Sequence, residues 1–283
     1  MKNLNKKIRM LVSIFLIVSM FLIFFIWQNN SIVVSNYDYA SPEIPGDFAG
    51  FRIVHISDLH NKMFGKDQIK LLSEVEKLSP DIIIITGDLI DRRKFDLEKA
   101  ICFIDGAMGI APVYFVSGNH EAWSGKYSEI RERLLASSVV VMDDTSIEIS
   151  RGESTIKLLG LSDPGFYNES RNRDLNIENL DALLNEWQGD EGFKILLSHR
   201  PELFDRYCVN RIDLIFAGHA HGGQFRIPFV GPIFAPNQGF FPKFTAGRYS
   251  KGSSTMFVSR GLGNSIIPIR IFNRPEIVAV TLN

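Results

Sequence analysis

Short apolar runs alternate with amphipathic stretches along the chain from Phe51 onward. The runs are rich in β-branched, aliphatic and aromatic residues, and they predict strands at residues 51–56, 81–86, 112–116, 156–161, 193–197, 212–217, 255–259 and 277–282. Between them, apolar positions at helical spacing predict helices within residues 68–78, 127–135 and 180–187. Runs without polar positions, such as residues 82–85, are typical of sheets covered on both faces. The alternation therefore predicts one α/β layered domain over residues 51–283.

The first thirty residues follow a different pattern, because residues 10–27 form an uninterrupted stretch without charge. A helix of this length spans most of a hydrocarbon core of roughly 30 Å. Lysines and an arginine precede it, and no basic residue follows before Arg52. The positive-inside rule therefore predicts a cytoplasmic basic stub at residues 1–9, a single-pass transmembrane signal-anchor at 10–27, a tether at 28–50 and an extracytoplasmic domain beyond it. A cleaved signal peptide is the alternative to this anchor in the cell membrane, and the mass of the mature protein would distinguish the two.

Composition narrows the possible classes of function. Lys and Arg together number 31 and Asp and Glu number 32, which gives a formal net charge of −1 and argues against a nucleic-acid partner. Apolar residues make up 45% of the chain, enough for a packed core. Cys102 and Cys208 are too few for a disulfide framework and lie in no metal-binding pair, so we expect both to be buried packing residues.

Polar residues follow directly where five of the predicted strands end. They are Asp58 and His60, Asp88 and Asp91, Asn119 and His120, His199, and His219 and His221. A turn or a buried imidazole would explain any one of these residues alone. Ligands bind in the crevice outside the carboxyl ends of strands in α/β sheets, however, so the five segments together predict a common site.

The chemistry of these side chains indicates a metal centre. Carboxylates, one amide oxygen and four imidazoles, with no thiolate, form a nitrogen and oxygen ligand set that suits Mn²⁺, Fe²⁺ or Zn²⁺. Seven candidate ligands are more than one ion needs, and a bridging carboxylate can hold two ions about 3.5–4 Å apart. The remaining histidine, His55, lies inside the first predicted strand and is expected to be a core residue.

The motifs and their spacing resemble those of the calcineurin-like metallophosphoesterase superfamily. The blocks are DLH at residues 58–60, GDLIDR at 87–92, GNHE at 118–121, the later His199, and GHAH at 218–221. Residues 218–224 and 259–263 are similar to the membrane-anchored or exported bacterial phosphodiesterase branch, which includes enzymes similar to UDP-2,3-diacylglucosamine hydrolase; that branch often has Thr where this chain has Ala220. The resemblance implies a four-layer β-sandwich flanked by helices.

The resemblance also implies a role for each motif residue. Asp88 would bridge two divalent ions. The other ligands would be Asp58, His60 and His221 on the first ion, and Asn119, His199 and His219 on the second. Asp91 resembles the carboxylate that orients a catalytic histidine, and His120, which is not needed as a ligand, is placed to protonate the leaving oxygen. Arg92 would either clamp a phosphoryl oxygen or pair with an acidic neighbour.

These features predict a dinuclear-metal-dependent phosphoesterase, in which a hydroxide shared by the two ions attacks phosphorus in line. One alternative is a pyrophosphatase of the UDP-2,3-diacylglucosamine type, although its substrate is expected on the cytosolic side, opposite to the predicted position of the domain. A non-catalytic metal-binding module is an alternative from a different class, and the complete set of ligands argues against it.

The segment from residue 225 to residue 244 carries six phenylalanines and four prolines. The prolines exclude a regular helix or a central strand. Either the aromatic side chains pack under the sheet in a Pro-rich hairpin, or they form an exposed apolar rim beside the site that contacts membrane or lipid. In the second case the anchor would hold the rim near the bilayer, and we expect a preference for lipid-linked or cell-envelope phosphodiesters.

Overall fold

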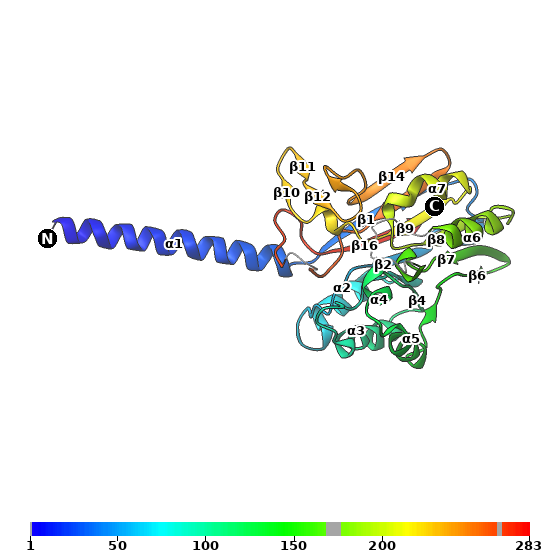
Figure 1. The fold of residues 1–283 in the computed structure, drawn as a ribbon, viewed down its shortest axis with the longest axis horizontal. Helices are drawn as coiled ribbons and strands as arrows, with labels where there is room; N and C mark the ends of the chain where they lie inside the picture. Colours follow the sequence, from blue (N-terminus) through cyan, green and yellow to red (C-terminus); the bar gives the residue numbers. More distant parts are fainter. Residues whose placement is uncertain (1, 168–176, 265–267) are drawn as a thin grey trace.

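Two six-stranded mixed sheets form the centre of the protein (Figure 1). The computed structural model describes residues 2–167, 177–264 and 268–283. In pairing order, the first sheet contains β1 (Val33–Tyr39), β16 (Glu276–Leu282), β2 (Arg52–Ile56), β3 (Ile82–Thr86), β4 (Val113–Val116) and β5 (Val140–Val141). The second contains β14 (Gly247–Lys251), β15 (Ser254–Val258), β9 (Leu214–Ala217), β8 (Lys194–Leu197), β7 (Ser154–Gly160) and β6 (Thr145–Arg151).

Apolar side chains between the two sheets form the central core. Ile53 of β2 and Ile84 of β3 pack there with Phe216 of β9, and all three are fully buried. Because side chains alternate along a strand, Val54 and Ile83 point to the other face of the first sheet and pack in a second buried cluster. Both faces of β2 and β3 are therefore covered, which explains why β3 has no polar residue before its last position.

Helices cover the outer face of each sheet. Those on the first sheet are α2 (Ile69–Lys77), α3 (Leu97–Met108) and α5 (Tyr127–Ala136), and those on the second are α6 (Glu178–Gln188) and α7 (Phe204–Val209). A one-turn helix, α4 (Asn119–Ala122), follows β4, and short 3₁₀ helices occupy Gly46–Phe48, Lys66–Gln68, Pro164–Tyr167, Pro201–Leu203 and His221–Gly223. The order helix, sheet, sheet, helix is the four-layer sandwich that the family resemblance implies.

Most elements agree with the sequence prediction. All eight predicted strands and all three predicted helices are present, with ends shifted by no more than two residues. Helix α3 was not predicted, because Gly106 and several polar residues interrupt its apolar positions. His55 is a core residue as expected: it is fully buried, its Nε2 lies 2.7 Å from Thr86 Oγ1, and burial lowers its pKa to about 3.

Two expectations about packing need correction. Cys102 and Cys208 form no disulfide, but both are partly exposed rather than buried, because each lies beside the buried side of its helix rather than within it. The predicted tether, residues 28–50, contains β1, whose seven residues pair in parallel with β16 from Val33 opposite Glu276 to Tyr39 opposite Leu282. Tyr39 is only 3% exposed and packs in the central core, so most of this segment belongs to the folded domain.

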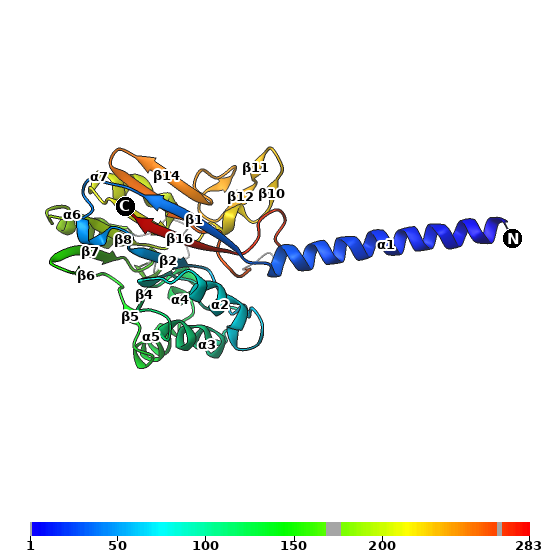
Figure 2. The same cartoon turned by 180° about the vertical axis from the view of Figure 1, so that it is seen from behind.

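Helix α1 (Lys2–Asn30) projects from the domain as a single long rod (Figures 1 and 2). In the described part of the chain it alone is long and apolar enough to cross a bilayer, over Lys6–Asn30, and it is a single-pass membrane candidate. Only Ser31 and Ile32 separate it from β1.

The direction of the strands determines which edge of the first sheet lies next to α1. Strand β1 starts beside α1, β16 is parallel to β1, and β2 is antiparallel to β16. Strands β3 and β4 are parallel to β2. The carboxyl ends of β2, β3 and β4 therefore lie at the edge of the sheet from which α1 leaves.

Candidate metal centre

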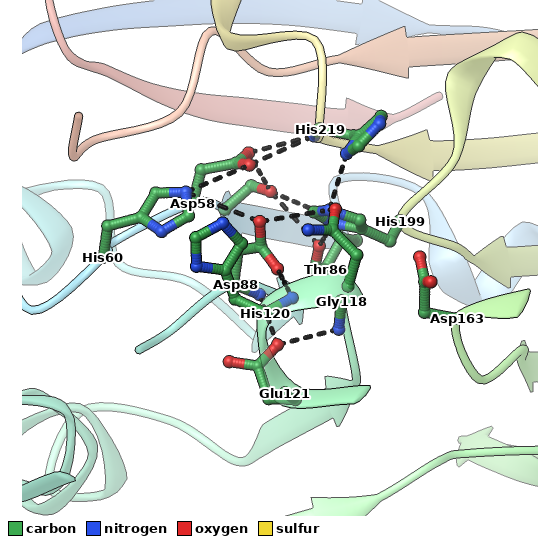
Figure 3. Close-up of polar contacts among 12 residues, drawn as sticks. Asp58, His60, Thr86, Asp88, Gly118, His120, Glu121, Asp163, His199 and His219 are labelled. Atoms are coloured by element: carbon green, nitrogen blue, oxygen red, sulfur yellow. Dashed lines mark hydrogen bonds and ion pairs between the residues drawn. The ribbon is translucent and has the colours of Figure 1, made fainter. Parts of the chain in front are cut away.

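The seven predicted ligands converge at the carboxyl ends of five strands. Figure 3 shows five of them close together: Asp58, His60, Asp88, His199 and His219. Asp58 and His60 follow β2, Asp88 follows β3, Asn119 begins α4 after β4, His199 follows β8, and His219 and His221 follow β9. None of these side chains belongs to a residue more than 6% exposed. The two sheets thus bring residues up to 163 positions apart in the sequence (58 to 221) into one buried cluster.

Asp88 belongs to two groups of potential ligand atoms. One group contains Asp58, His60, Asp88 and His221, and the other contains Asp88, His199 and His219; within each, the atoms lie within 4.8 Å of one another. Oδ2 of Asp88 lies 3.5 Å from His60 Nε2 and 3.4 Å from His199 Nε2. Oδ1 of Asn119 lies 3.2 Å from His199 Nε2 and extends the second group. A single carboxylate oxygen therefore stands between the two groups.

The distances and protonation states suit bound cations. His60 Nε2 lies 3.2 Å from His221 Nε2, and His199 Nε2 lies 3.1 Å from His219 Nδ1; two nitrogen ligands about 2.1 Å from one ion are themselves roughly 3 Å apart. Burial lowers the pKa of His60 to about 3 and that of His221 well below its usual value, so both rings are neutral and have a lone pair to donate. Burial also opposes charge on His199, but the Asp88 carboxylate raises its pKa to about 10. The cluster attracts positive charge, as expected of a dinuclear metal site.

Unusual backbone conformations place these ligands. Five of the seven have a positive φ between 46° and 65°: Asp58, His60, Asp88, His219 and His221. Such strain is costly for residues other than glycine and clusters at functional sites. The turn at Gly118 packs so closely against the turn at Asp88 that only glycine fits, because a Cβ on Gly118 would lie 2.3 Å from Asp88 Oδ1. The glycine in the GNHE motif therefore makes room for the shared carboxylate.

His120 and its neighbours form the wall of a hollow of about 130 Å³ next to Asp88. The Arg92 backbone N–H donates to His120 Nδ1 at 3.1 Å, so a neutral His120 carries its proton on Nε2. Asp91 Oδ1 is 3.7 Å from the same Nδ1, and its carboxylate pairs with Arg93. The Arg92 guanidinium lies over the Trp123 ring, 5.1 Å from its centre, and makes no ion pair with any described residue, so the expected alternative of pairing with an acidic neighbour is not observed.

Glu121 is a site residue that the sequence reasoning missed. It is fully buried, and its Oε2 accepts hydrogen bonds from the backbone N–H groups of Asp88 at 2.7 Å and Gly118 at 2.8 Å, while Oε1 accepts from Ile90 N–H at 3.2 Å. Burial and the nearby Asp88 carboxylate raise its pKa to about 8. Its position at the end of the GNHE motif was the sequence feature that could have identified it. Glu121 holds the loop that carries the shared carboxylate.

Arg200 and Asn237 were also missed, and both contact His219. His219 Nε2 lies 2.9 Å from Asn237 Oδ1 and 2.9 Å from Arg200 Nη1. The fully buried Arg200 is held by Asp163, with Nε 2.5 Å from Oδ2 and Nη2 2.9 Å from Oδ1. If His219 binds an ion through Nδ1, its Nε2–H donates to Asn237 Oδ1. Arg200 follows His199 in the sequence, whereas no motif marked Asn237.

Asn237 comes from the phenylalanine-rich segment, which forms two small hairpins. They are β10 (Arg226–Ile227) with β11 (Gly231–Pro232), and β12 (Phe234–Ala235) with β13 (Gly239–Phe240). Phe229, Phe240 and Phe241 are 108%, 73% and 71% exposed. Phe244 is buried against Phe204. The exposed apolar rim is therefore present, although part of the segment packs inward.

Comparisons with known proteins indicate the family to which the chain belongs. Residues 51–223 match the family model described as calcineurin-like phosphoesterase. The chain is 29% identical over 263 residues to a Bacillus subtilis (strain 168) protein named "Uncharacterized metallophosphoesterase YkuE", covering 90% of this chain and 87% of that one. It is 27% identical over 244 residues to Phosphodiesterase YaeI of Escherichia coli (strain K12), covering 83% of each.

Two further matches are more distant. A Danio rerio relative, named as a transmembrane protein with a metallophosphoesterase domain, is 27% identical over 85% of this chain and 55% of its own length. Among solved structures, the phosphopantetheinyl hydrolase PptH of Mycobacterium tuberculosis matches with a TM-score of 0.49 and 14% identity, over 76% of this chain and 91% of that one. With the family model matching more than half of the sequence, the chain belongs to the calcineurin-like phosphoesterase family and is a metallophosphoesterase, a hydrolase of phosphoester bonds.

Proposed function

We propose that this protein hydrolyses a lipid-linked or cell-envelope phosphodiester with two divalent metal ions. The observation that carries the metal part of the proposal is the position of Asp88 Oδ2, within 3.5 Å of nitrogens from both groups of ligands. A carboxylate oxygen in this position suits a bridge between two ions. Mn²⁺, Fe²⁺ and Zn²⁺ all suit the nitrogen and oxygen donors.

Each ion would have its own set of ligands. Asp58, His60 and His221 would hold the first ion, Asn119, His199 and His219 would hold the second, and Asp88 would bind both. Bound there, the ions would supply a water of lowered pKa and the positive charge that a transferring phosphoryl group requires.

The remaining site residues bind substrate and move a proton. The Arg92 N–H bond to Nδ1 keeps a neutral His120 protonated on Nε2. To act as the acid, the ring would take up a second proton on Nδ1, give its Nε2 proton to the leaving oxygen and become neutral again. Asp91 lies 3.7 Å from Nδ1 and stabilises positive charge on the ring. The Arg92 side chain, at the same hollow and without a carboxylate partner among the described residues, binds a phosphoryl oxygen.

The substrate class rests on the surroundings of the site. The exposed phenylalanines belong to the same hairpins as Asn237, which contacts His219, and α1 is a membrane candidate. Lysines and Arg9 precede the apolar part of α1, so we propose a cytoplasmic N-terminus and an extracytoplasmic domain. A pyrophosphatase acting on a cytosolic UDP-linked substrate would need the opposite orientation.

The test uses the full chain in detergent, loaded in turn with Mn²⁺, Fe²⁺, Zn²⁺ and Mg²⁺ and assayed on bis-p-nitrophenyl phosphate. We expect hydrolysis with at least one ion and two bound ions per chain by elemental analysis. Asp88→Asn should lose activity by at least about a thousandfold, because both ions lose a ligand. Asp38→Asn, on the exposed side of β1, is the matched control and should behave as wild type.

Two outcomes would contradict the proposal. Two ions per chain in Asp88→Asn would exclude the bridging role. No hydrolysis of any phosphomonoester or phosphodiester with any of the four ions would exclude the enzymatic function.

A further inference from the structure

We infer that a lipid headgroup reaches the metal centre through a cleft beside α1, and that Lys94 binds its anionic part. The inference rests on the proposed function and names the substrate class more closely: a phosphodiester whose acyl chains stay in the bilayer. The cleft has a volume of about 820 Å³, within the size range of small-molecule sites.

The cleft connects the metal centre with the end of α1. Its lining includes His60 and Asp91 of the site as well as Asn264 and Pro268. Asn264 Nδ2 donates to Asn29 Oδ1, in the last turn of α1, at 3.1 Å. A ligand entering past Asn264 therefore moves from the end of the membrane candidate helix toward a predicted metal ligand.

Further contacts fix α1 at this edge of the domain. Arg270 N–H donates to Asn29 Oδ1 at 3.0 Å, and the Phe24 ring lies 5.6 Å from the Phe272 ring. The Arg274 guanidinium lies over the Trp27 ring at 4.7 Å. Tryptophan and arginine side chains of this kind are typical of the membrane–water interface. The mouth of the cleft thus lies where the bilayer surface is expected.

The short connection after α1 keeps the domain at that surface. Two residues, Ser31 and Ile32, extend at most about 7 Å, similar to the roughly 5–7 Å of polar headgroup on one side of a bilayer. Arg274 also holds Ser31, with Nη2 2.6 Å from its Oγ. The carboxyl ends of β2, β3 and β4, which carry four of the seven predicted ligands, lie at this same edge. A long tether would have permitted other orientations of the domain relative to the bilayer, whereas this two-residue connection does not.

The charges of the cleft favour an anionic group. Arg93 pairs with Asp91 at 3.0 Å, and Lys99 pairs with Asp96 at 2.9 Å. Lys94 is exposed and forms no ion pair with any residue that the structure describes. These five side chains therefore leave one uncompensated positive charge between the metal centre and α1, placed to bind a headgroup phosphate.

The test compares two substrates that share a leaving group. The full chain is placed in nanodiscs of phosphatidylcholine and assayed on phosphatidyl-p-nitrophenol in the disc and on soluble bis-p-nitrophenyl phosphate. We expect Lys94→Glu to lower kcat/KM for the lipid about tenfold, because it replaces attraction with repulsion. For the soluble diester, kcat/KM should fall by no more than about twofold. Arg131→Glu, an equal charge reversal at an exposed position of α5 outside the cleft, is the matched control.

A binding measurement separates recognition from turnover. Soluble dihexanoyl phosphatidylglycerol is titrated into the same discs, with and without Mn²⁺, and we expect Lys94→Glu to raise its Kd about tenfold. Equal losses on both substrates, or the same loss in Arg131→Glu, would overturn the assignment of the cleft. If the wild type hydrolyses only the soluble diester, the role of the cleft in lipid binding is overturned while the phosphoesterase activity stands. If it hydrolyses neither substrate, the proposed function itself is overturned.

Discussion

Asn237 contacts a predicted metal ligand from a hairpin that carries no metal-binding motif. Its Oδ1 lies 2.9 Å from His219 Nε2. Hydrogen bonds to the outer nitrogen of a ligating histidine orient the ring and fix its tautomer. Their loss typically weakens metal binding by roughly 10–100-fold. We therefore expect the hairpin to contribute to metal binding at the candidate centre without supplying a ligand.

Replacing Asn237 tests this contribution. We expect Asn237→Ala to weaken binding of the second Mn²⁺ roughly tenfold or more, and Asn237→Asp, which keeps an oxygen acceptor, to bind it nearly as wild type. Isothermal titration of the metal-free chain measures both steps of binding, and Asn36→Ala at an exposed position of β1 serves as the control. Identical titrations for wild type and Asn237→Ala would show that the contact does not orient His219.

Asp143 predicts a measurable dependence of stability on pH. It accepts hydrogen bonds from Ser117 N–H at 2.7 Å and Ser117 Oγ at 2.9 Å, and from Tyr127. Burial raises its pKa from 3.8 to about 6. Because its pKa is raised in the folded state, the contribution of Asp143 to the free energy of unfolding is complete below pH 3.8 and is lost as pH rises through 6.

Asp143→Asn removes this titration and keeps the acceptor for Ser117. The free energy of unfolding of wild type relative to Asp143→Asn should therefore fall by about 3 kcal/mol between pH 3.5 and pH 7. Urea unfolding of both proteins at the two pH values gives the difference, in which effects common to both cancel. A constant difference would mean that Asp143 titrates normally.

Single residues also show the limits of prediction from sequence. The candidate metal ligands could be predicted because Asp, Asn and His directly follow apolar strands, which is a local signal. Glu121 acts on the backbone of Asp88 across 33 positions, and Asn237 acts on His219 from a separate hairpin. Such partners depend on how the loops pack, which no local pattern records. The same reason explains why Arg92 lies over Trp123 instead of pairing with a carboxylate.

Strand β1 changes where the folded domain begins. It lies at the edge of the first sheet and covers one side of β16 over seven residues. Its exposed positions, Asn36 and Asp38, are polar, so the segment lacks the continuous apolar run by which the central strands were predicted. The strands that the sequence pattern left out are therefore edge strands and the two-residue strands of small hairpins, such as β10 to β13.

Removing β1 should destabilise the domain. A fragment starting at Ser41 loses the burial of Tyr39, worth about 2 kcal/mol or more, and exposes the unpaired edge of β16, which favours aggregation. We expect its urea midpoint to fall below that of a fragment starting at Ser31, and its soluble yield to fall with it. Equal midpoints for the two fragments would place β1 outside the cooperative fold.

At the scale of the whole molecule, exposed apolar side chains and the candidate metal centre share the end of the domain next to α1. The exposed rings of Phe240 and Phe241 belong to the hairpin that supplies Asn237. Rings of this kind gain free energy at a bilayer interface, on the order of 1–2 kcal/mol each. The fragment 31–283, which lacks α1, should therefore still bind vesicles.

Replacing both rings measures this contribution. The double variant Phe240→Ser, Phe241→Ser of fragment 31–283 should bind phosphatidylglycerol vesicles at least about tenfold more weakly in a sedimentation assay. Val209→Ser, an exposed apolar residue at the end of α7, is the control and should bind as the parent fragment. Unchanged binding in the double variant would show that the rings do not touch lipid.

Strand β16 also determines how the molecule can be handled on a surface. It runs parallel to β1 and away from α1, and the seven residues of the strand span roughly 23 Å at about 3.3 Å per residue. Asn283, whose N–H donates to Tyr39 O at 2.9 Å, thus lies at the end opposite α1 (Figures 1 and 2). A sensor chip that captures the protein through a carboxyl-terminal tag would leave the end with the candidate metal centre facing the flow, in the orientation that arriving liposomes require.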